Sequence, residues 1–525
     1  MLIFLLSILP SFIYLFYKSK KSFQILQQNW YNDSNRYIKW IFNNIGKVFV
    51  SLDILIIFIF LFKNKILLTS IYIIFYFVML LVYFYDKQKE QNKKPLVITA
   101  RIKRLYITMY IIYILVILLF LINFNINLLS TYYLLLGILI YFNWFIIALA
   151  NFLNRPIEKK VFNKYKNQAL KKLDSIPNFK KIGITGSYGK TSVKNMVNEV
   201  LKVKYNSYAT EKSYNTMNGL MLAINNKLDK YTDIFIAEMG AFHKGEIKEK
   251  AEFIQPDYGI LTVIGTAHLE DFKTRENIRD TKFELIEQLP ESGVAILNMD
   301  DPYQVNYKLK NKCNVFWISI KNKDADIYAS DIKMNKDGMS FLVSFKNGEN
   351  NVKFTTKLLG IHNVSNILCA IAMGYILGLT MEELKLGVKN INSIEHRLEL
   401  KKWHDIYLID DAFNSNPEGA KMALDVLALM PGKKVIVTPG MIELGKDQYN
   451  YNKEFGKNIA KICDEVILVG EIQTKAIMDG LIEANFDEDK VFITNDIKEA
   501  FKKFYKYPKN TYVLLENDLP DIFNE

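Results

Sequence analysis

The chain has 525 residues, half of them apolar, and a formal net charge of +12. Its length corresponds to roughly three domains, and a 23% share of charged residues excludes a disordered or collagen-like chain. Residues 1–155 hold 16 Lys and Arg against 4 Asp and Glu, whereas residues 156–525 hold 51 of each class. Because the basic excess lies wholly in the first third, we expect no nucleic-acid partner for the rest of the chain.

Five apolar stretches fill the first third of the chain. They occupy residues 1–17, 48–62, 66–85, 105–124 and 128–153. A helix needs roughly 17–25 residues to cross the hydrocarbon core, so the last three are long enough and the first two are marginal. A single short run could be a buried core helix, but five in succession with few acids predict a multi-pass transmembrane domain of about five helices over 1–155. Asp53 is expected to face other helices or an interface.

The basic residues of this domain lie in two loops, 18–47 and 86–104, whereas the loop 123–127 carries no charge. Basic loops of membrane proteins remain on the cytoplasmic side. The pattern therefore predicts an N-terminus outside the cell membrane and a cytoplasmic location for everything after Arg155, with membrane lipid as a partner. Residues 1–17 have the length of a signal peptide, but the basic residues follow them rather than precede them, which favours a retained anchor.

After a Lys- and Asn-rich linker at 156–177, short β-rich runs alternate with helical periodicity. We expect a central α/β domain at 178–392 and a C-terminal α/β domain at 393–525, both with mostly parallel sheets and ligands at the carboxyl ends of the strands. The short β-rich runs and turn residues within 326–360 predict antiparallel hairpins. The expected strands are 181–185, 234–237, 259–263, 294–297, 435–437, 466–469 and 512–515.

Three scattered cysteines, Cys313, Cys369 and Cys463, form no CxxC pair. This number and spacing favour a reducing compartment and exclude a four-cysteine zinc site.

The strongest local motif is a glycine-rich loop between a predicted strand and a predicted helix. It comprises Thr185 and the expected phosphate-binding residues Gly186, Ser187, Tyr188, Gly189, Lys190, Thr191 and Ser192. Backbone N–H groups of such a loop bind phosphate oxygens, Lys190 would reach the outer phosphates, and the Thr191 hydroxyl would bind Mg²⁺. The full eight-residue P-loop has Gly where this chain has Ile184, so the match is the shorter GxxGKT form.

Six further segments follow in a fixed order and complete a family pattern. They are Glu238–Ala241, Ala267–Glu270, Lys282 with Glu284, Leu297–Pro302, Gly360–Asn366, and Arg397 with Asp410–Pro417. From about residue 178 onward the chain resembles the Mur ligases, ATP-dependent synthetases that form amide bonds. The Asn-x-Asn-Pro segment and Gly440–Gly445 most resemble the family member that adds D-alanyl-D-alanine to UDP-N-acetylmuramoyl-tripeptide. Sibling ligases usually carry His where Asn414 stands.

The resemblance implies roles for individual residues. ATP and Mg²⁺ are the implied cofactors, and a peptidoglycan precursor and a D-amino-acid dipeptide are the implied substrates. The implied sites are Lys190, Lys282, His268 and Arg397 for catalysis; Thr191, Glu238, His268 and a carbamate on Lys282 for the metal; Asn298, Asn363, Arg397 and Asp411 for the nucleotide; and Asn215, Asn414 and Asn416 on the substrate side. Without the resemblance, Lys282 would be assigned as a surface charge, His268 as a structural loop residue, and either nucleotide-side Asn as a turn cap.

The chemistry of amide synthesis agrees with these assignments. A carboxylate needs a leaving group, which ATP supplies by forming an acyl phosphate. Phosphoryl transfer between two anions requires positive charge where they meet. Lys190, Arg397 and Mg²⁺ would supply that charge.

The chain departs from the family at its N-terminal side, where soluble members carry a domain that recognises the UDP-sugar. Only about 20 residues separate the predicted membrane and ATP domains, so two acceptors are open: a UDP-linked peptide bound by the remaining domains, or a lipid-linked acceptor bound with the membrane region. A different Mur-type ligase is a nearby alternative, although its amidating form needs four cysteines. A membrane sensor that binds ATP without ligation is the alternative from another class.

Overall fold

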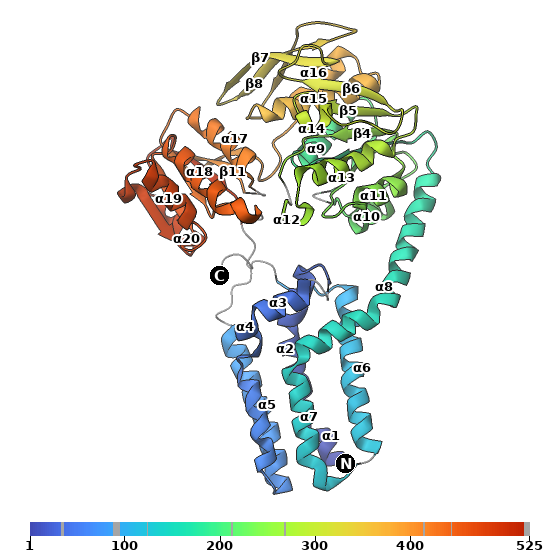
Figure 1. Ribbon diagram of the computed structural model, residues 1–525, viewed down its shortest axis with the longest axis vertical. Helices are drawn as coiled ribbons and strands as arrows, with labels where there is room; N and C mark the ends of the chain where they lie inside the picture. Colours follow the sequence, from blue (N-terminus) through green and yellow to red (C-terminus); the bar gives the residue numbers. More distant parts are fainter. Residues whose placement is uncertain are drawn as a thin grey trace. The chain divides into compact units, whose positions relative to one another are not determined.

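The computed structural model describes residues 1–32, 36–87, 95–122, 124–211, 214–266, 269–412, 415–442 and 444–518. The chain forms two compact units, one ending at Lys164 and the other beginning at Tyr165. Each unit has its own hydrophobic core. Figure 1 shows the helices of the first unit and the two sheets of the second.

The first unit is helical. Its elements are α1 (Leu2–Ser7), α2 (Leu9–Gln28), α3 (Ile38–Asn43), α4 (Ile45–Phe49), the 3₁₀ helices η2 (Leu52–Leu61) and η3 (Ile126–Leu128), α5 (Lys65–Lys87), α6 (Ala100–Ile122), α7 (Leu129–Tyr141) and α8 (Asn143–Asp174). Three described stretches are long and apolar enough to cross a membrane, Leu2–Gln28, α5 and α6. The pair Ile126–Tyr141 and Asn143–Asp174, bent by 72°, makes a fourth if it is one span. The sequence predicted about five.

Two of the predicted stretches account for the difference: 128–153 falls in the bent pair, and 48–62 contains only a short helix. The helical part of the latter is η2, a ten-residue 3₁₀ helix, which rises about 20 Å against a hydrocarbon core of about 30 Å. It packs closely on α7, because a Cβ added at Gly137 would lie 2.4 Å from the side chain of Ile56. This tight packing is a tertiary contact that the hydropathy of 48–62 does not reveal.

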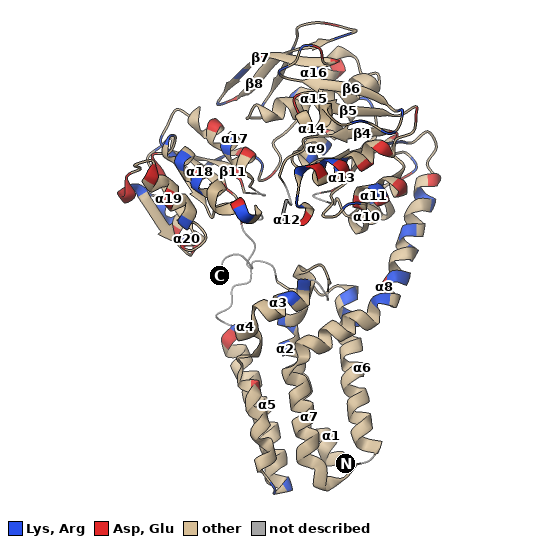
Figure 2. Cartoon of the chain, viewed as in Figure 1, with Lys and Arg blue, Asp and Glu red and all other residues tan. Residues whose placement is uncertain are grey.

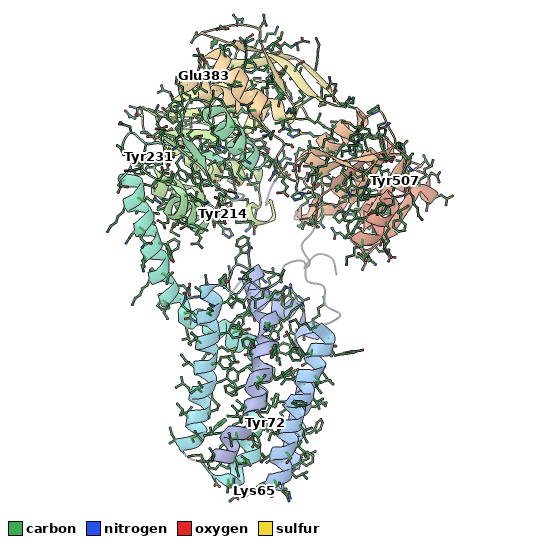
Figure 3. All side chains as sticks on the ribbon, turned by 180° about the vertical axis from the view of Figure 1, so that it is seen from behind. Lys65, Tyr72, Tyr214, Tyr231, Glu383 and Tyr507 are labelled. Atoms are coloured by element: carbon green, nitrogen blue, oxygen red, sulfur yellow. The ribbon has the colours of Figure 1, made fainter. Side chains whose placement is uncertain are left out.

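The two predicted basic loops meet at one end of this unit. The Gln27 side chain exchanges two hydrogen bonds of 3.0 Å with the backbone of Val97. At the opposite end, which Figure 3 marks by Lys65, the Lys65 Nζ donates to Asn127 Oδ1 at 2.9 Å. Between these ends the long helices carry almost no charge (Figure 2). The arrangement fits the predicted orientation, and the side of the membrane on which each end lies stays a prediction.

Asp53 turns into the first unit, as its position among apolar residues predicted. It is 3% exposed, accepts a hydrogen bond of 2.5 Å from Tyr14 Oη, and forms an ion pair with Lys18. A buried carboxylate costs several kcal/mol unless it is paired. The ion pair therefore allows η2 to carry an acid in an apolar setting.

Most of the segment expected as a linker, 156–177, is helical. Residues up to Asp174 continue helix α8, with Pro156 inside it. Val161, Tyr165, Ala169 and Leu173 recur every four residues, the spacing of one helical face, and Ala169 and Leu173 are buried. The Lys- and Asn-rich composition hid this periodicity.

The second unit contains a nine-stranded sheet with the order β2-β3-β1-β4-β5-β6-β7-β8-β9. Its strands are β1 (Lys180–Thr185), β2 (Ser207–Ala209), β3 (Ile234–Glu238), β4 (Tyr258–Leu261), β5 (Val294–Asn298), β6 (Asn314–Ser319), β7 (Ile327–Asn335), β8 (Gly338–Phe345) and β9 (Val352–Thr356). The pairs from β2 to β7 are parallel, whereas β7-β8 and β8-β9 are antiparallel. The predicted parallel sheet and the predicted hairpins at 326–360 are thus both confirmed.

Helices cover both faces of this sheet. They are α9 (Lys190–Leu201), α10 (Met217–Lys227), α11 (Glu246–Ile254), α12 (Leu269–Phe272), α13 (Arg275–Glu287), α14 (Pro302–Val305), α15 (His362–Ile376) and α16 (Met381–Asn390). Ile182 and Ile184 of β1 belong to the core shared with α9 and α15. Gly183 between them faces α13, where an added Cβ would lie 2.6 Å from Leu285. Successive side chains of a strand point to opposite faces, so β1 is buried on both.

A six-stranded sheet follows, with the order β10-β11-β15-β12-β13-β14. Its strands are β10 (Glu399–Trp403), β11 (Ile406–Asp411), β12 (Lys434–Thr438), β13 (Glu465–Val469), β14 (Val491–Thr494) and β15 (Tyr512–Glu516). Its helices are α17 (Pro417–Ala428), α18 (Gln448–Ala460), α19 (Lys475–Glu483) and α20 (Ile497–Phe504), with 3₁₀ turns η4 (Gly445–Asp447) and η5 (Glu488–Lys490). All strand pairs except β10-β11 are parallel.

Acidic residues stand at the carboxyl ends of strands in both sheets. Glu238 ends β3, Asp411 ends β11 and Glu516 ends β15. Ligands of open α/β sheets bind at these strand ends, so these three carboxylates mark the edges where a functional site is expected.

Candidate functional site

The loop between β1 and α9 depends on two glycines with positive φ, Gly186 at +149° and Gly189 at +78°. A Cβ added at Gly186 would lie 1.9 Å from Thr262 Oγ1, so only glycine fits there. Gly189 directly precedes α9, whose first backbone N–H groups have no partner within the helix and favour an anion. The predicted strand–loop–helix arrangement is confirmed.

Residues 262–266, after β4, support this loop. Ser187 N–H donates to Val263 O at 2.7 Å, and Thr262 Oγ1 donates to Tyr188 O at 2.5 Å. Tyr188 Oη and Thr266 Oγ1 share a hydrogen bond of 2.9 Å. The loop is therefore fixed by a second segment rather than by its glycines alone.

Lys190 folds back over the loop. Its Nζ donates to Gly186 O at 2.8 Å and to Ser187 O at 2.9 Å. Burial lowers the pKa of Lys190 to about 8, although Glu238 raises it. Phosphate oxygens could replace these two carbonyls as partners of the ammonium.

A small cavity of about 50 Å³ lies against the loop. Its lining includes both predicted lysines, Lys190 and Lys282, and also Asn215. Lys282 of α13 is only 2% exposed, and burial, followed by the charges of Lys190 and Lys250, brings its pKa well below the usual range. The Lys190 ammonium and the N-terminus of α9 at this cavity favour an anionic ligand.

Glu238 meets a lysine that the sequence reasoning did not select. Lys194 Nζ lies 3.2 Å from Glu238 Oε2, with 0% and 1% of the two side chains exposed. Asn215 Nδ2 donates to Glu238 Oε1 at 3.0 Å. Lys194 stands four residues after Lys190 on α9, hence on the same helical face, and this spacing was the signal available in the sequence.

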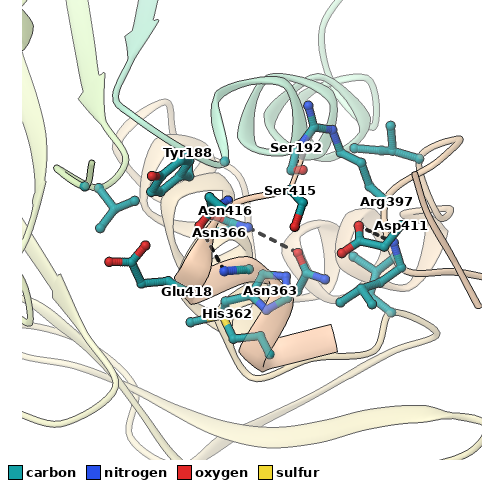
Figure 4. A pocket seen from close by; sticks show the side chains of 18 of the residues that line it. Tyr188, Ser192, His362, Asn363, Asn366, Arg397, Asp411, Ser415, Asn416 and Glu418 are labelled. Carbon is teal, nitrogen blue, oxygen red and sulfur yellow. Dashed lines mark hydrogen bonds between the residues drawn. The ribbon is translucent and has the colours of Figure 1, made fainter. Parts of the chain in front are cut away.

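A larger cavity of about 250 Å³ lies between the central and C-terminal domains (Figure 4). Of the predicted site residues, those that line it are Tyr188, Gly189, Ser192, Asn363, Arg397, Asp411 and Asn416. They come from the β1–α9 loop, α15 and the beginning of the C-terminal domain. The structure thus brings together segments more than 200 residues apart in the sequence.

Arg397 and Asp411 lie side by side in this cavity (Figure 4). Burial lowers the pKa of Arg397, and Asp411 and Glu238 oppose that shift. Burial raises the pKa of Asp411, which accepts a hydrogen bond of 3.1 Å from Leu398 N–H. An arginine so placed would reach phosphate.

Two further cavity residues were missed, His362 and Glu516. Burial, followed by the charge of Arg397, lowers the pKa of His362 to about 4, so its ring is neutral at pH 7. Glu516 is 1% exposed. It directly follows the predicted strand 512–515, and a polar residue at a strand end was the signal available.

Some predicted residues lie outside the two cavity linings or have a structural role as well. Asn298 Oδ1 accepts from Asp300 N–H at 2.9 Å, so it caps a turn, and it is absent from the lining of both cavities. Asn416 caps α17 through Gly419 N–H at 2.9 Å as well as lining the larger cavity. Thr191 stands in the first turn of α9. His268 and Asn414 fall outside the described residues.

No group of three His, Cys, Asp or Glu suited to a metal occurs among the residues that the structure describes. The Thr191 hydroxyl and the Glu238 carboxylate are nevertheless oxygen donors beside a phosphate loop, and Mg²⁺ binds few protein oxygens while keeping phosphate oxygens and waters. This donor set fits Mg²⁺ bound together with a nucleotide.

Two protein-family models match the chain, Mur ligase middle domain over residues 184–374 and Mur ligase, glutamate ligase domain over residues 396–515. These limits agree with the two sheets and leave the first unit unmatched.

Curated relatives named UDP-N-acetylmuramoyl-tripeptide--D-alanyl-D-alanine ligase match the same region. The protein of Bacillus subtilis strain 168 is 34% identical over 316 residues, 59% of this chain and 66% of that protein. The protein of Buchnera aphidicola subsp. Acyrthosiphon pisum strain APS is 30% identical over 337 residues, 63% of this chain and 70% of that protein. The chain thus spans about two thirds of the length of these relatives.

Solved structures share the fold. MurF from Thermotoga maritima in complex with ADP has a TM-score of 0.61 at 24% identity, over 68% of this chain and 80% of that one. MurF from Acinetobacter baumannii has a TM-score of 0.62 at 24% identity, over 68% and 78%.

Proposed function

The chain belongs to the Mur ligase family, and from this membership we propose that it is a ligase that uses ATP to join an amine to a carboxylate of a peptidoglycan precursor. The observation that carries the proposal is the small cavity at the glycine-rich loop, where Lys190 and Lys282 meet. An ATP-driven ligase must hold two anions, the phosphates and the substrate carboxylate, close enough to form an acyl phosphate. The Lys190 ammonium and the N-terminus of α9 would supply positive charge at that point.

Different groups at the loop would bind different parts of the ATP phosphates. The N–H groups at the start of α9 would bind phosphate oxygens, and Lys190 would exchange its two carbonyl partners for them. Arg397 would approach the outer phosphate from the C-terminal domain. Because Arg397 and Lys190 stand on different domains, closure of the two would complete the charge around the transferred group.

Mg²⁺ would be held by Thr191 and Glu238, and it would neutralise phosphate charge when bound. Lys282 fits a carbamate, because burial brings the pKa of its amine well below the usual range and so favours the neutral form that reacts with CO₂. A carbamate there would place an anion at the cavity that Lys190 also lines.

For the substrates, we propose D-alanyl-D-alanine as the amine donor and a UDP-N-acetylmuramoyl-peptide as the acceptor, as in the names of the relatives. Asn215 and Asn416 would face the substrates.

A lipid-linked acceptor is the second candidate. The first unit supports it, since three of its helices have the length and apolar character of membrane spans. The catalytic unit would then act at the cytoplasmic surface of the cell membrane.

The test is a substrate screen with the detergent-solubilised full chain. ATP, Mg²⁺ and D-alanyl-D-alanine are offered with either UDP-linked or lipid-linked muramoyl-tripeptide, and products are identified by mass. We expect acceptor-dependent release of phosphate and a product heavier by the dipeptide residue, both lost in Lys282→Ala. ATP binding without turnover on any acceptor would instead indicate a sensor.

A further inference from the structure

An aromatic cluster lies at the surface of the C-terminal domain, outside both cavities. Trp403 and His404 belong to the end of β10 and the turn after it, and Phe501, Phe504 and Tyr505 to the end of α20 and the residue after it. The ring centroids of Trp403 and Tyr505 are 5.0 Å apart, and those of His404 and Tyr505 are 5.9 Å apart. None of these residues lines either cavity, so the nucleotide does not explain the cluster.

Helix α20 carries aromatic rings on two adjacent faces. Ala500 and Phe504 are 0% and 3% exposed and belong to a core shared with β11, β12, β13 and β15. Phe501 and Tyr505 stand four residues apart on the neighbouring face and are 41% and 73% exposed. The outer face of a helix on a soluble domain is normally polar. The two exposed rings therefore indicate a contact with something outside the domain.

Lysines surround the exposed rings. Residues 402–405 and 497–509 together hold six Lys against two Asp and Glu, whereas residues 156–525 as a whole hold 51 of each class. Lys503 and Lys509 pair with acids. Three others are exposed and form no ion pair with a residue that the structure describes, namely Lys402, Lys502 and Lys506. The aromatic cluster thus lies within a local excess of positive charge on a body that is neutral overall.

This combination of groups matches the surface of a lipid bilayer. Trp and Tyr are enriched where a protein meets the headgroups of a membrane, and basic helices with exposed aromatic rings bind anionic lipid. Lys is depleted in protein interfaces, which disfavours a protein partner. Three stretches of the first unit are long and apolar enough to cross a membrane, and the same chain would then keep the second unit within reach of the bilayer.

We propose that this aromatic-basic patch binds the anionic surface of a lipid bilayer. The patch comprises Trp403, His404, Phe501 and Tyr505 with Lys402, Lys502 and Lys506. Its rings would enter the headgroup region, and its lysines would pair with lipid phosphates. The inference goes beyond the proposed ligation, because it gives the C-terminal domain a membrane contact of its own with either acceptor.

The test measures contact between the patch and lipid in the full chain. The three cysteines of the chain are buried, so a cysteine introduced at the surface can be labelled selectively with the fluorophore NBD. Tyr505→Cys reports on the patch, and Tyr231→Cys, at a position 68% exposed on the central domain, is the matched control. Each labelled chain is reconstituted in nanodiscs of phosphatidylglycerol or phosphatidylcholine. A nitroxide lipid in the nanodiscs quenches a fluorophore that touches the bilayer surface.

In phosphatidylglycerol we expect quenching at position 505 to be at least about threefold stronger than at position 231, and to weaken in phosphatidylcholine. Asp405→Cys is a second reporter that leaves every aromatic residue of the patch in place, and it should be quenched as position 505 is.

A triple variant tests the role of charge. Lys402→Glu, Lys502→Glu and Lys506→Glu together should reduce the quenching at position 505 to the level at position 231. The affinity for an ATP analogue should stay within about twofold, because none of these lysines lines a cavity.

A second triple variant is the control for net charge. It changes three exposed lysines of the central domain to Glu, namely Lys323, Lys353 and Lys389, and it should leave the quenching unchanged. Thermal unfolding establishes that each variant is folded.

Quenching at position 505 no stronger than at position 231 would overturn the inference, and so would quenching that is insensitive to lipid charge and to the lysine substitutions. An NBD signal at position 505 that responds to added protein but not to the nitroxide lipid would identify a protein interface instead. If the chain does not enter nanodiscs, the labelled chains are mixed with vesicles of the same lipids, and absence of quenching there overturns the inference equally. The readout needs no ligation, so its failure is distinguishable from a failed substrate screen.

Discussion

The ammonium nitrogen of Lys194 lies 3.2 Å from a carboxylate oxygen of Glu238, and solvent reaches neither side chain. Lys190, one helical turn earlier, points to the carbonyls of the phosphate loop. Helix α9 therefore presents one lysine to the nucleotide and another to the acid at the end of β3. The second lysine fixes the acid that we assign to Mg²⁺.

Replacing Lys194 with Met should destabilise the catalytic unit by about 3–5 kcal/mol, because a buried charge then loses its partner. Chemical unfolding of the full chain measures the change. Glu238→Gln added to Lys194→Met should recover part of the loss, since no charge remains to be paired. The matched control is Lys202→Met, which breaks the exposed pair with Glu199 and should cost less than about 1 kcal/mol. Equal effects of the two Met variants would contradict the assignment.

Gly186→Ala should abolish nucleotide binding. The new Cβ would meet Thr262 Oγ1 at 1.9 Å and displace the loop. Binding of a fluorescent ATP analogue checks this outcome. Gly245 has a similar positive φ of +93° but open space around it, so Gly245→Ala should cost about 1 kcal/mol of stability and leave nucleotide affinity within twofold.

Nucleotide affinity should fall as the pH rises from 7 to 9. The Lys190 pKa is about 8 without ligand, so the ammonium that binds phosphate is present below that pH and is progressively lost above it. Lys190→Arg should flatten this dependence, because arginine stays charged throughout the range. Titrations of the ATP analogue at each pH provide the measurement, and a wild-type slope retained in Lys190→Arg would assign the pH dependence to another group.

A carbamate should form on Lys282 in bicarbonate buffer. With ¹³C-labelled bicarbonate, we expect one protected carbamate resonance in the NMR spectrum of the full chain. It should vanish in Lys282→Met and persist in Lys250→Met, since Lys250 is also buried but pairs with Glu246. A resonance that survives Lys282→Met would place the carbamate elsewhere.

The sheets and the glycine-rich loop could be predicted from sequence because their signals are local. The short apolar run of β1 is followed directly by the helical periodicity of α9. Gly186 and Gly189 between them mark a turn with positive φ that other residues rarely adopt. The predicted hairpins at 326–360 follow from the same short-range alternation.

The remaining features depend on contacts between distant segments. Helix η2 is a 3₁₀ helix that packs on Gly137, a residue at least 76 positions away from η2 in the sequence. Glu516 comes to line the larger cavity beside Asp411 only because β15 pairs with β11, more than 100 residues earlier. His362 resembles any helix-terminal residue until burial beside Arg397 makes its ring neutral.

Residues 262–266 also contact Asp301, which belongs to the predicted nucleotide-side motif Leu297–Pro302. This contact connects the glycine-rich loop to that motif. Asp301 Oδ2 accepts from Ile264 N–H at 2.8 Å and from Gln304 Nε2 at 3.0 Å. Residues 262–266, which form hydrogen bonds with Ser187 and Tyr188, are thus themselves fixed by Asp301, just after β5. The consequence is evolutionary: position 301 should keep an acceptor side chain across homologues, whereas position 264 can offer its backbone N–H with any residue except proline.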